Sequence, residues 1–72
     1  MIIVTGTVNF ESLSEVEQVT QALINRAQRS RKDAGCVCYS FSKNLEDPTE
    51  ICLTEKWESV ELLQAHLEIV DE

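Results

Sequence analysis

The sequence is short of basic residues and has no long apolar run, and each shortage argues against a class of protein. Six lysines and arginines stand against 13 aspartates and glutamates, which gives a net charge of -7. Because phosphates repel such a chain, we expect neither nucleic acid nor an anionic membrane surface as a partner. No apolar run approaches the roughly 20 residues that cross a bilayer. Without a linker, repeat or low-complexity segment, the 72 residues are expected to form one small domain.

The three cysteines are an odd number, and no secretion signal accompanies them. The apolar start of the chain, residues 1–5, is too short for a signal peptide and has no basic region before it. This combination is typical of free thiols in a reducing compartment, so we expect a cytoplasmic protein. A tetrahedral metal site needs a fourth ligand besides three thiols, and the single histidine lies far along the chain. We therefore predict no metal site.

Three segments alternate between apolar and polar residues, which predicts β-strands at residues 2–10, 36–43 and 50–57. In the second strand, Val37 and Tyr39 share one face, while Cys36 and Cys38 share the other. Gly6, in the middle of the first strand, predicts a bulge or a close approach by another group. The short turn between the second and third strands predicts an antiparallel hairpin.

Two other segments repeat apolar residues at steps of three and four, which predicts amphipathic helices. The first carries Val16, Val19, Leu23 and Ala27. Ser12 and Ser14 both offer a helix start, Ser14 and Glu17 match a capping box, and Gly35 is a natural stop. The second helix is expected over residues 60–70, after Ser59 as N-cap, with Val60, Leu63, Leu67 and Val70 as its apolar stripe and Leu62 and Ile69 beside it.

The resulting order, β-α-β-β-α, predicts an α+β fold of the ferredoxin-like kind that lacks the final strand of that motif. Either residues 1–72 are a fragment, or that strand is absent or replaced. Two helices can cover only one face of the sheet, and the other face needs a second surface. A two-fold homodimer is the simplest way to supply it.

Four motifs follow one another in register: D-A-G-C-V-C-Y at 33–39, D-P at 47–48, E-K-W-E-S at 55–59 and L-L-Q-A-H-L at 62–67. Through them the chain resembles the antibiotic biosynthesis monooxygenase family, with Ala34 where that family has proline. The resemblance covers essentially the whole chain. It implies a dimeric α+β barrel with two sheets face to face and a cavity between sheet and helices. It also implies oxidation of phenolic, anthrone or hydroquinone substrates by molecular oxygen, without metal or flavin.

The site residues of the family match this chain in part. Trp57 matches the tryptophan of E-x-W-x-S. Leu53 and Leu63 stand where one branch of the family has asparagine and tyrosine. The haem-degrading branch has an asparagine close to the position of Thr7 and a histidine later than His66, so haem cleavage is not expected.

Three residues are candidates for catalysis, namely Trp57, His66 and Glu55. An indole can stack on a flat aromatic substrate, or it can anchor the core or a dimer interface. An imidazole can remove a phenolic proton near neutral pH, or it can be a packed or surface residue of the helix. Glu55, an acid on an apolar strand face, is either functional or paired with a lysine or arginine.

Three further residues are candidates for substrate binding, namely Tyr39, Thr7 and Asn44. The Tyr39 hydroxyl can bond a substrate oxygen, although its alternation with apolar neighbours also suits a core position. Thr7 is equally an ordinary strand threonine, and Asn44 is equally a turn residue.

The first functional hypothesis is a cofactor-independent monooxygenase that oxidises a small aromatic quinol, phenol or anthrone. The alternative is a non-catalytic dimeric ligand-binding or stress-response module, to which Leu53, Leu63 and the missing strand point. A third hypothesis, of another class, is an isomerase or haem-degrading relative. The fold alone does not decide among them.

Overall fold

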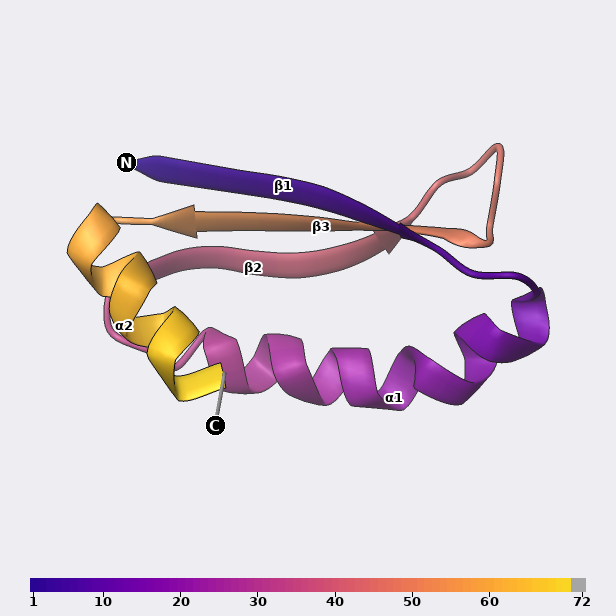
Figure 1. Ribbon diagram of the computed structural model, residues 1–72, viewed down its shortest axis with the longest axis horizontal. Helices are drawn as coiled ribbons and strands as arrows, with labels where there is room; N and C mark the ends of the chain where they lie inside the picture. Colours follow the sequence, from indigo (N-terminus) through magenta and orange to yellow (C-terminus); the bar gives the residue numbers. More distant parts are fainter. Residues whose placement is uncertain (71–72) are drawn as a thin grey trace.

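The protein is a three-stranded antiparallel sheet with both helices on the same face (Figure 1). The computed structural model describes residues 1–70, and side chains through residue 68. The elements are β1 (Ile2–Asn9), α1 (Leu13–Ser30), β2 (Cys36–Lys43), β3 (Glu50–Trp57) and α2 (Val60–Val70). This confirms the predicted α+β class and the β-α-β-β-α order of a ferredoxin-like fold. Neither described helix has the length and apolar character of a membrane span.

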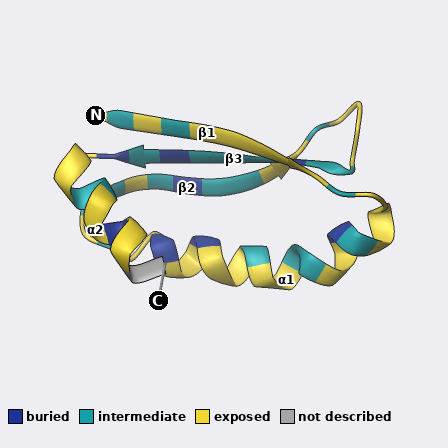
Figure 2. Ribbon diagram, viewed as in Figure 1, coloured by how far each residue is buried: buried dark blue, intermediate teal, exposed yellow. Residues whose placement is uncertain are grey.

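The strand order is β1-β3-β2, so β3 is central and pairs with both neighbours. β1 pairs with β3 along its whole length, from Ile2 opposite Trp57 to Asn9 opposite Glu50. Opposed residues point to the same side of a sheet. Because Trp57 and Ile51 are buried, the face they share with Ile2 is the one that the helices cover (Figure 2).

A β-bulge lies in β2 between Cys36 and Cys38, which face Trp57 and Lys56 respectively. The two cysteines therefore lie on opposite faces of the sheet, and the prediction that they share a face was wrong. Cys36 packs against the core while Val37, the extra residue, is half exposed. The regular alternation of the sequence hid this extra residue.

Gly6 needs neither a bulge nor a close neighbour, contrary to the prediction. Its strand pairs without interruption, with Gly6 opposite Leu53. A Cβ added at Gly6 would meet no atom within 4 Å. The glycine leaves open space in front of the sheet.

Of the two predicted starts of α1, the structure uses Ser12 and not the capping box at Ser14. Ser12 is the N-cap, and its hydroxyl accepts a hydrogen bond from the backbone N–H of Glu15 over 3.2 Å. The predicted apolar stripe is confirmed, with Val16 and Ala27 buried. The helix ends at Ser30 rather than running to Gly35, because the N–H groups of Lys32 and Asp33 turn back to carbonyls three residues before them.

α2 spans the predicted residues, and the Ser59 hydroxyl caps it by accepting from the backbone N–H of Leu62. Its buried face differs from the predicted stripe. Val60 and Leu67 are about half exposed, whereas His66 is only 3% exposed. Two predicted apolar positions, Ile69 and Val70, have side chains outside the described residues. The face of α2 that meets the sheet is therefore centred on a histidine.

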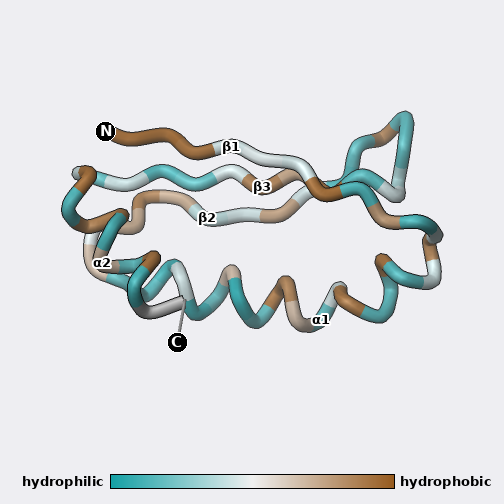
Figure 3. The backbone as a smooth tube through the Cα atoms, viewed as in Figure 1, coloured by the Kyte–Doolittle hydropathy of each residue, from teal (hydrophilic) through white to brown (hydrophobic). Residues whose placement is uncertain are grey.

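The core is small and lies where the two helices meet the sheet. Ala27, Tyr39 and Trp57 form its buried cluster, and the half-buried apolar side chains packed on it are Ile2, Cys36, Phe41, Leu53 and Leu63. Apolar colour in Figure 3 runs along the start of β1 and recurs on α1. The sheet face away from the helices carries mostly small polar residues, among them Thr5, Thr54 and Ser40. The face that was expected to need a second surface is thus mostly polar.

Candidate active site

A cavity of about 290 Å³ lies between the sheet and the helices. All three strands and both helices contribute to its wall. The lining is largely apolar, from residues such as Phe10, Leu23, Phe41, Ile51 and Leu53. Its polar groups come from Thr7, Arg26, Tyr39, Glu55 and His66. An apolar cavity with a few convergent polar groups is the usual form of a small-molecule site, and this volume is at the lower end of the roughly 300–1,000 Å³ range.

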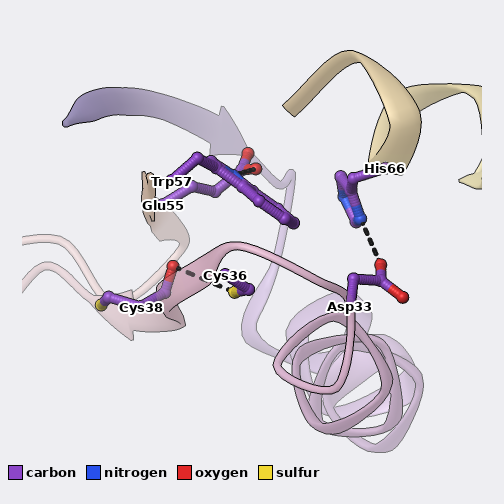
Figure 4. A network of polar contacts seen from close by, with 6 residues as sticks. All are labelled: Asp33, Cys36, Cys38, Glu55, Trp57 and His66. Atoms are coloured by element: carbon purple, nitrogen blue, oxygen red, sulfur yellow. Dashed lines mark hydrogen bonds and ion pairs between the residues drawn. The ribbon is translucent and has the colours of Figure 1, made fainter. Parts of the chain in front are cut away.

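His66, on α2, is held against Asp33 from the turn that precedes β2 (Figure 4). The His66 Nδ1 and Asp33 Oδ2 atoms are 2.7 Å apart. Because a carboxylate can only accept, Nδ1 carries the proton and the neutral ring keeps Nε2 as its basic nitrogen. The imidazole is almost fully buried, whereas the Asp33 side chain keeps 21% of its surface exposed. The pair orients a potential base on the wall of the cavity.

Glu55 and Trp57 follow one another on the helix-facing side of β3. The Trp57 indole N–H donates to Glu55 Oε1 over 2.9 Å, and both side chains are buried. Glu55 was expected to pair with a lysine or arginine. Among the described residues no such ion pair forms, and the indole takes that place. A neutral donor satisfies the carboxylate without cancelling its charge.

Three rings form one cluster at the inner end of the cavity. The rings of Trp57 and His66 have centroids 4.6 Å apart at a tilt of 35°. Tyr39 meets His66 edge-on, at 5.6 Å and 62°. These contacts lock the imidazole from two sides, as a catalytic base requires.

The structure brings together four of the six predicted site residues. Tyr39, Glu55 and His66 line the cavity, and Trp57 stands directly behind His66. Thr7 borders the cavity on β1, but it lies opposite Cys52 on the sheet face away from the helices. Its backbone, rather than its hydroxyl, is therefore the part that faces inward.

Asn44 lies apart from the cavity, in the turn between β2 and β3. Its side chain donates to Glu50 and accepts from the backbone N–H of Glu46. Both bonds serve the turn, which is the alternative that the sequence analysis gave for this residue.

Sequence reasoning missed Asp33 and Arg26. An aspartate just before a glycine is fully explained as a turn residue, so nothing in the sequence marked Asp33 as the partner of His66. Arg26 lies with other basic residues toward the end of a helix, where the helix dipole alone explains a cluster of cations. Only the packing of α1 and α2 over the sheet shows that these residues reach the site.

Of the three thiols, only Cys36 lies on the sheet face that the helices cover. Cys36, Cys38 and Cys52 are all free. Within the described part of the chain, no three His, Cys, Asp or Glu side chains gather in a metal-binding arrangement. Burial raises the pKa of the Cys36 thiol, and the negative charge of Asp33 raises it further. Cys36 is therefore predominantly a thiol at neutral pH.

Residues 1–68 match the family model of the antibiotic biosynthesis monooxygenases. The chain belongs to this family. None of the curated proteins matches it. Among solved structures, it is similar to a proposed antibiotic biosynthesis monooxygenase from Deinococcus radiodurans, with 31% identity and a TM-score of 0.87. That match covers 93% of this chain and 65% of the Deinococcus protein.

A second monooxygenase-family structure, from Nitrosomonas europaea, shares the fold at 23% identity and a TM-score of 0.75. It covers 92% of this chain, which spans 61% of the Nitrosomonas protein. This chain is thus shorter than both family structures. The shared part includes every element that lines the cavity.

In this monooxygenase-family chain, the arrangement can bind and deprotonate a small molecule. An oriented imidazole can accept a proton, and the neighbouring carboxylate then stabilises the imidazolium. The apolar lining excludes water and favours a flat, apolar ring system. Glu55 offers a second acceptor for a hydroxyl group.

Proposed function

We propose that the protein is a cofactor-independent monooxygenase that oxidises a small phenol, quinol or anthrone with molecular oxygen. The observation that carries this proposal is the Asp33–His66 pair on the wall of an apolar cavity. Such a pair supplies the one thing that this chemistry demands of a protein, namely a base that ionises the substrate. An ionised phenol gives up an electron far more readily than a neutral one.

The first step is proton transfer from the phenolic O–H to Nε2 of His66, with Asp33 stabilising the imidazolium. The anion passes one electron to oxygen, and the resulting radical and superoxide combine at a ring carbon. The new C–O–O group takes up a proton, and its O–O bond breaks as the C–H proton leaves. One oxygen atom remains as a carbonyl and the other departs as water. For a phenol the balance is phenol plus oxygen giving quinone plus water.

Neither a metal nor a flavin takes part in these reaction steps, because oxygen is the oxidant and the substrate anion is the reductant. The cluster of Tyr39, Trp57 and His66 would hold the imidazole still while the ring of the substrate lies against the apolar wall. The role of the protein is therefore ionisation, positioning and exclusion of water.

Oxygen uptake with a panel of phenols, hydroquinones and anthrones tests the proposal, with the no-protein rate subtracted. We expect uptake proportional to protein concentration. Asp33→Asn should lower it about 10- to 100-fold, because an amide no longer fixes the ring and stabilises the imidazolium. Asp47→Asn is the matched control, since Asp47 lies in the exposed β2–β3 turn and should leave the rate unchanged.

Gly6→Val tests the cavity separately. A Cβ at Gly6 meets open space, so a larger side chain enters the cavity without disturbing the fold. We expect uptake to be lost while the melting temperature stays the same or rises, because glycine is unfavourable in a strand. If the folded protein binds such ligands but takes up no oxygen above the no-protein rate, the monooxygenase proposal is wrong and the binding-module alternative replaces it.

A further inference from the structure

The cavity has polar groups of opposite character on different walls. Glu55 from β3 and His66 from α2 are buried acceptors, exposed by 6% and 3%. Arg26 from α1 is a cation and remains exposed to solvent. A ligand that satisfies both ends has a hydrogen-bond donor at one end and an anion at the other.

Arg26 also belongs to a local excess of positive charge on an acidic protein. Four of the six basic residues lie on the second half of α1 or directly after it: Arg26, Arg29, Arg31 and Lys32. Within the described residues, no lysine or arginine lies within ion-pair distance of a carboxylate, so none of these cations is neutralised there. The chain as a whole, at net charge -7, repels anions. The positive charge near the end of α1 thus attracts anions to this part of the protein.

Of the four cations, only Arg26 borders this cavity. Arg31 uses its Nε–H to bond the carbonyl of Tyr39 at 3.0 Å, and it borders a different groove between α1 and β2. A guanidinium presents two parallel donors, which match the two oxygens of a carboxylate.

We infer that the substrate is an aromatic acid whose carboxylate pairs with Arg26 at the mouth of the cavity. Its ring lies on the apolar wall, and its hydroxyl reaches the acceptors His66 and Glu55. Arg26 is then a specificity-determining residue. This inference rests on the proposed function for the role of the hydroxyl, but the pairing itself is a binding property and does not need turnover.

Calorimetric titration under argon tests the pairing at equilibrium. The probes are 4-hydroxybenzoate and its uncharged counterpart 4-hydroxybenzamide, at neutral pH and low salt. We expect the acid to bind about tenfold more tightly than the amide, the size of a good charge-assisted bond at a partly exposed site. Added salt should shrink that preference and leave the amide unchanged.

Arg26→Gln should weaken binding of the acid about tenfold and binding of the amide less than about twofold. Arg26→Glu should make the acid the weaker ligand. Arg29→Gln is the matched control, because it removes the same charge from the same helix without touching the cavity. Retained preference for the acid in Arg29→Gln is the expected result, and far-UV circular dichroism checks that each variant is folded.

The inference is wrong if the acid binds no better than the amide, if it does not bind, or if Arg29→Gln has the same effect as Arg26→Gln. It stands, and the monooxygenase proposal falls, if the acid binds through Arg26 but no hydroxylated aromatic acid or neutral phenol drives oxygen uptake. Oxygen uptake that depends on neither the carboxylate nor Arg26 supports the monooxygenase proposal and contradicts the pairing.

Discussion

Trp57 combines two roles in one side chain. Its ring is fully buried in the core cluster, and its N–H is the donor that satisfies the buried Glu55 carboxylate. A buried carboxylate that loses its donor costs more than the bond itself was worth. The sequence analysis treated a core role and a catalytic role of Trp57 as alternatives. The hydrogen bond to Glu55 connects the two, because the buried Trp57 also holds a candidate catalytic carboxylate.

Trp57→Phe should consequently destabilise the fold by about 1–3 kcal/mol, because Glu55 is left buried without its indole donor. Urea unfolding followed by circular dichroism measures the change. In the double variant Trp57→Phe, Glu55→Gln the loss should be smaller, since an unpaired amide is cheaper to bury than an unpaired carboxylate. Equal losses in both variants would show that the hydrogen bond is unimportant.

The Cys36 thiol should be the slowest of the three to react with iodoacetamide. Its pKa is raised, first by burial and then by the negative charges of Asp33, Cys38 and Glu55. Only the thiolate is a nucleophile, so the raised pKa leaves less of the reactive form at a mildly alkaline pH. Mass spectrometry of peptides should show labelling of Cys36 still accelerating above about pH 10, where a thiol of ordinary pKa is almost fully ionised. Labelling of all three thiols with one common pH profile would contradict this.

At the scale of whole elements, periodicity predicted all three strands and both helices, because a buried face imposes its period on the sequence. Periodicity failed where the spacing of apolar residues in the sequence does not match the residues that are buried in the structure. The bulge at Cys36 and Cys38 is invisible in a regular alternation, and His66 occupies the buried face of α2 although it is not apolar. Candidate residues within one strand, such as Glu55 and Trp57, could be found from the sequence. The Asp33–His66 pair could not, since it joins two elements 33 positions apart.

The turn between α1 and β2 meets α2 through Gly35. This residue has φ of 83°, and a Cβ there would lie 2.7 Å from the Cβ of Leu62. Gly35→Ala should therefore cost about 2–4 kcal/mol, from backbone strain and overpacking together. Gly6→Ala is the control, because its added Cβ meets open space, and it should be neutral or slightly stabilising. Thermal unfolding compares the two, and similar melting temperatures would contradict the argument.

At the scale of the whole molecule, one face of the sheet has no cover within the described chain. Helices occupy only the other face (Figure 1), and the core beneath them is small. A small domain buries a modest fraction of its surface on folding, so a second interface would add to its stability. We expect the uncovered faces of two copies to meet, as the family resemblance implies, which would leave each cavity inside its own chain.

Thr54→Glu tests this assembly. Thr54 is half-buried on the central strand and lies opposite Thr5 on the uncovered face, so a carboxylate there would be desolvated by a second sheet. We expect sedimentation to give twice the 8.2 kDa chain mass for the wild type and a single chain mass for the variant. Gln18→Glu adds the same charge on the exposed side of α1 and should remain dimeric. A dimeric Thr54→Glu would place the interface elsewhere.

The strand order also dictates when the cavity can exist during folding. The hairpin of β2 and β3 closes locally, with Lys43 opposite Ile51. In contrast, α1, β2 and the β2–β3 turn all lie between β1 and the strand it pairs with, in which Asn9 stands opposite Glu50. Contacts between distant parts of a chain carry the larger entropy of loop closure and form late. We expect β1, which is an edge strand joined only by long-range contacts, to be the last strand to join the sheet and among the first to leave it. We therefore expect the pocket, whose wall includes Gly6 and Val8, to be assembled only when β1 joins the sheet. It should be lost when β1 leaves, together with the contact of Ile2 on the core around Trp57.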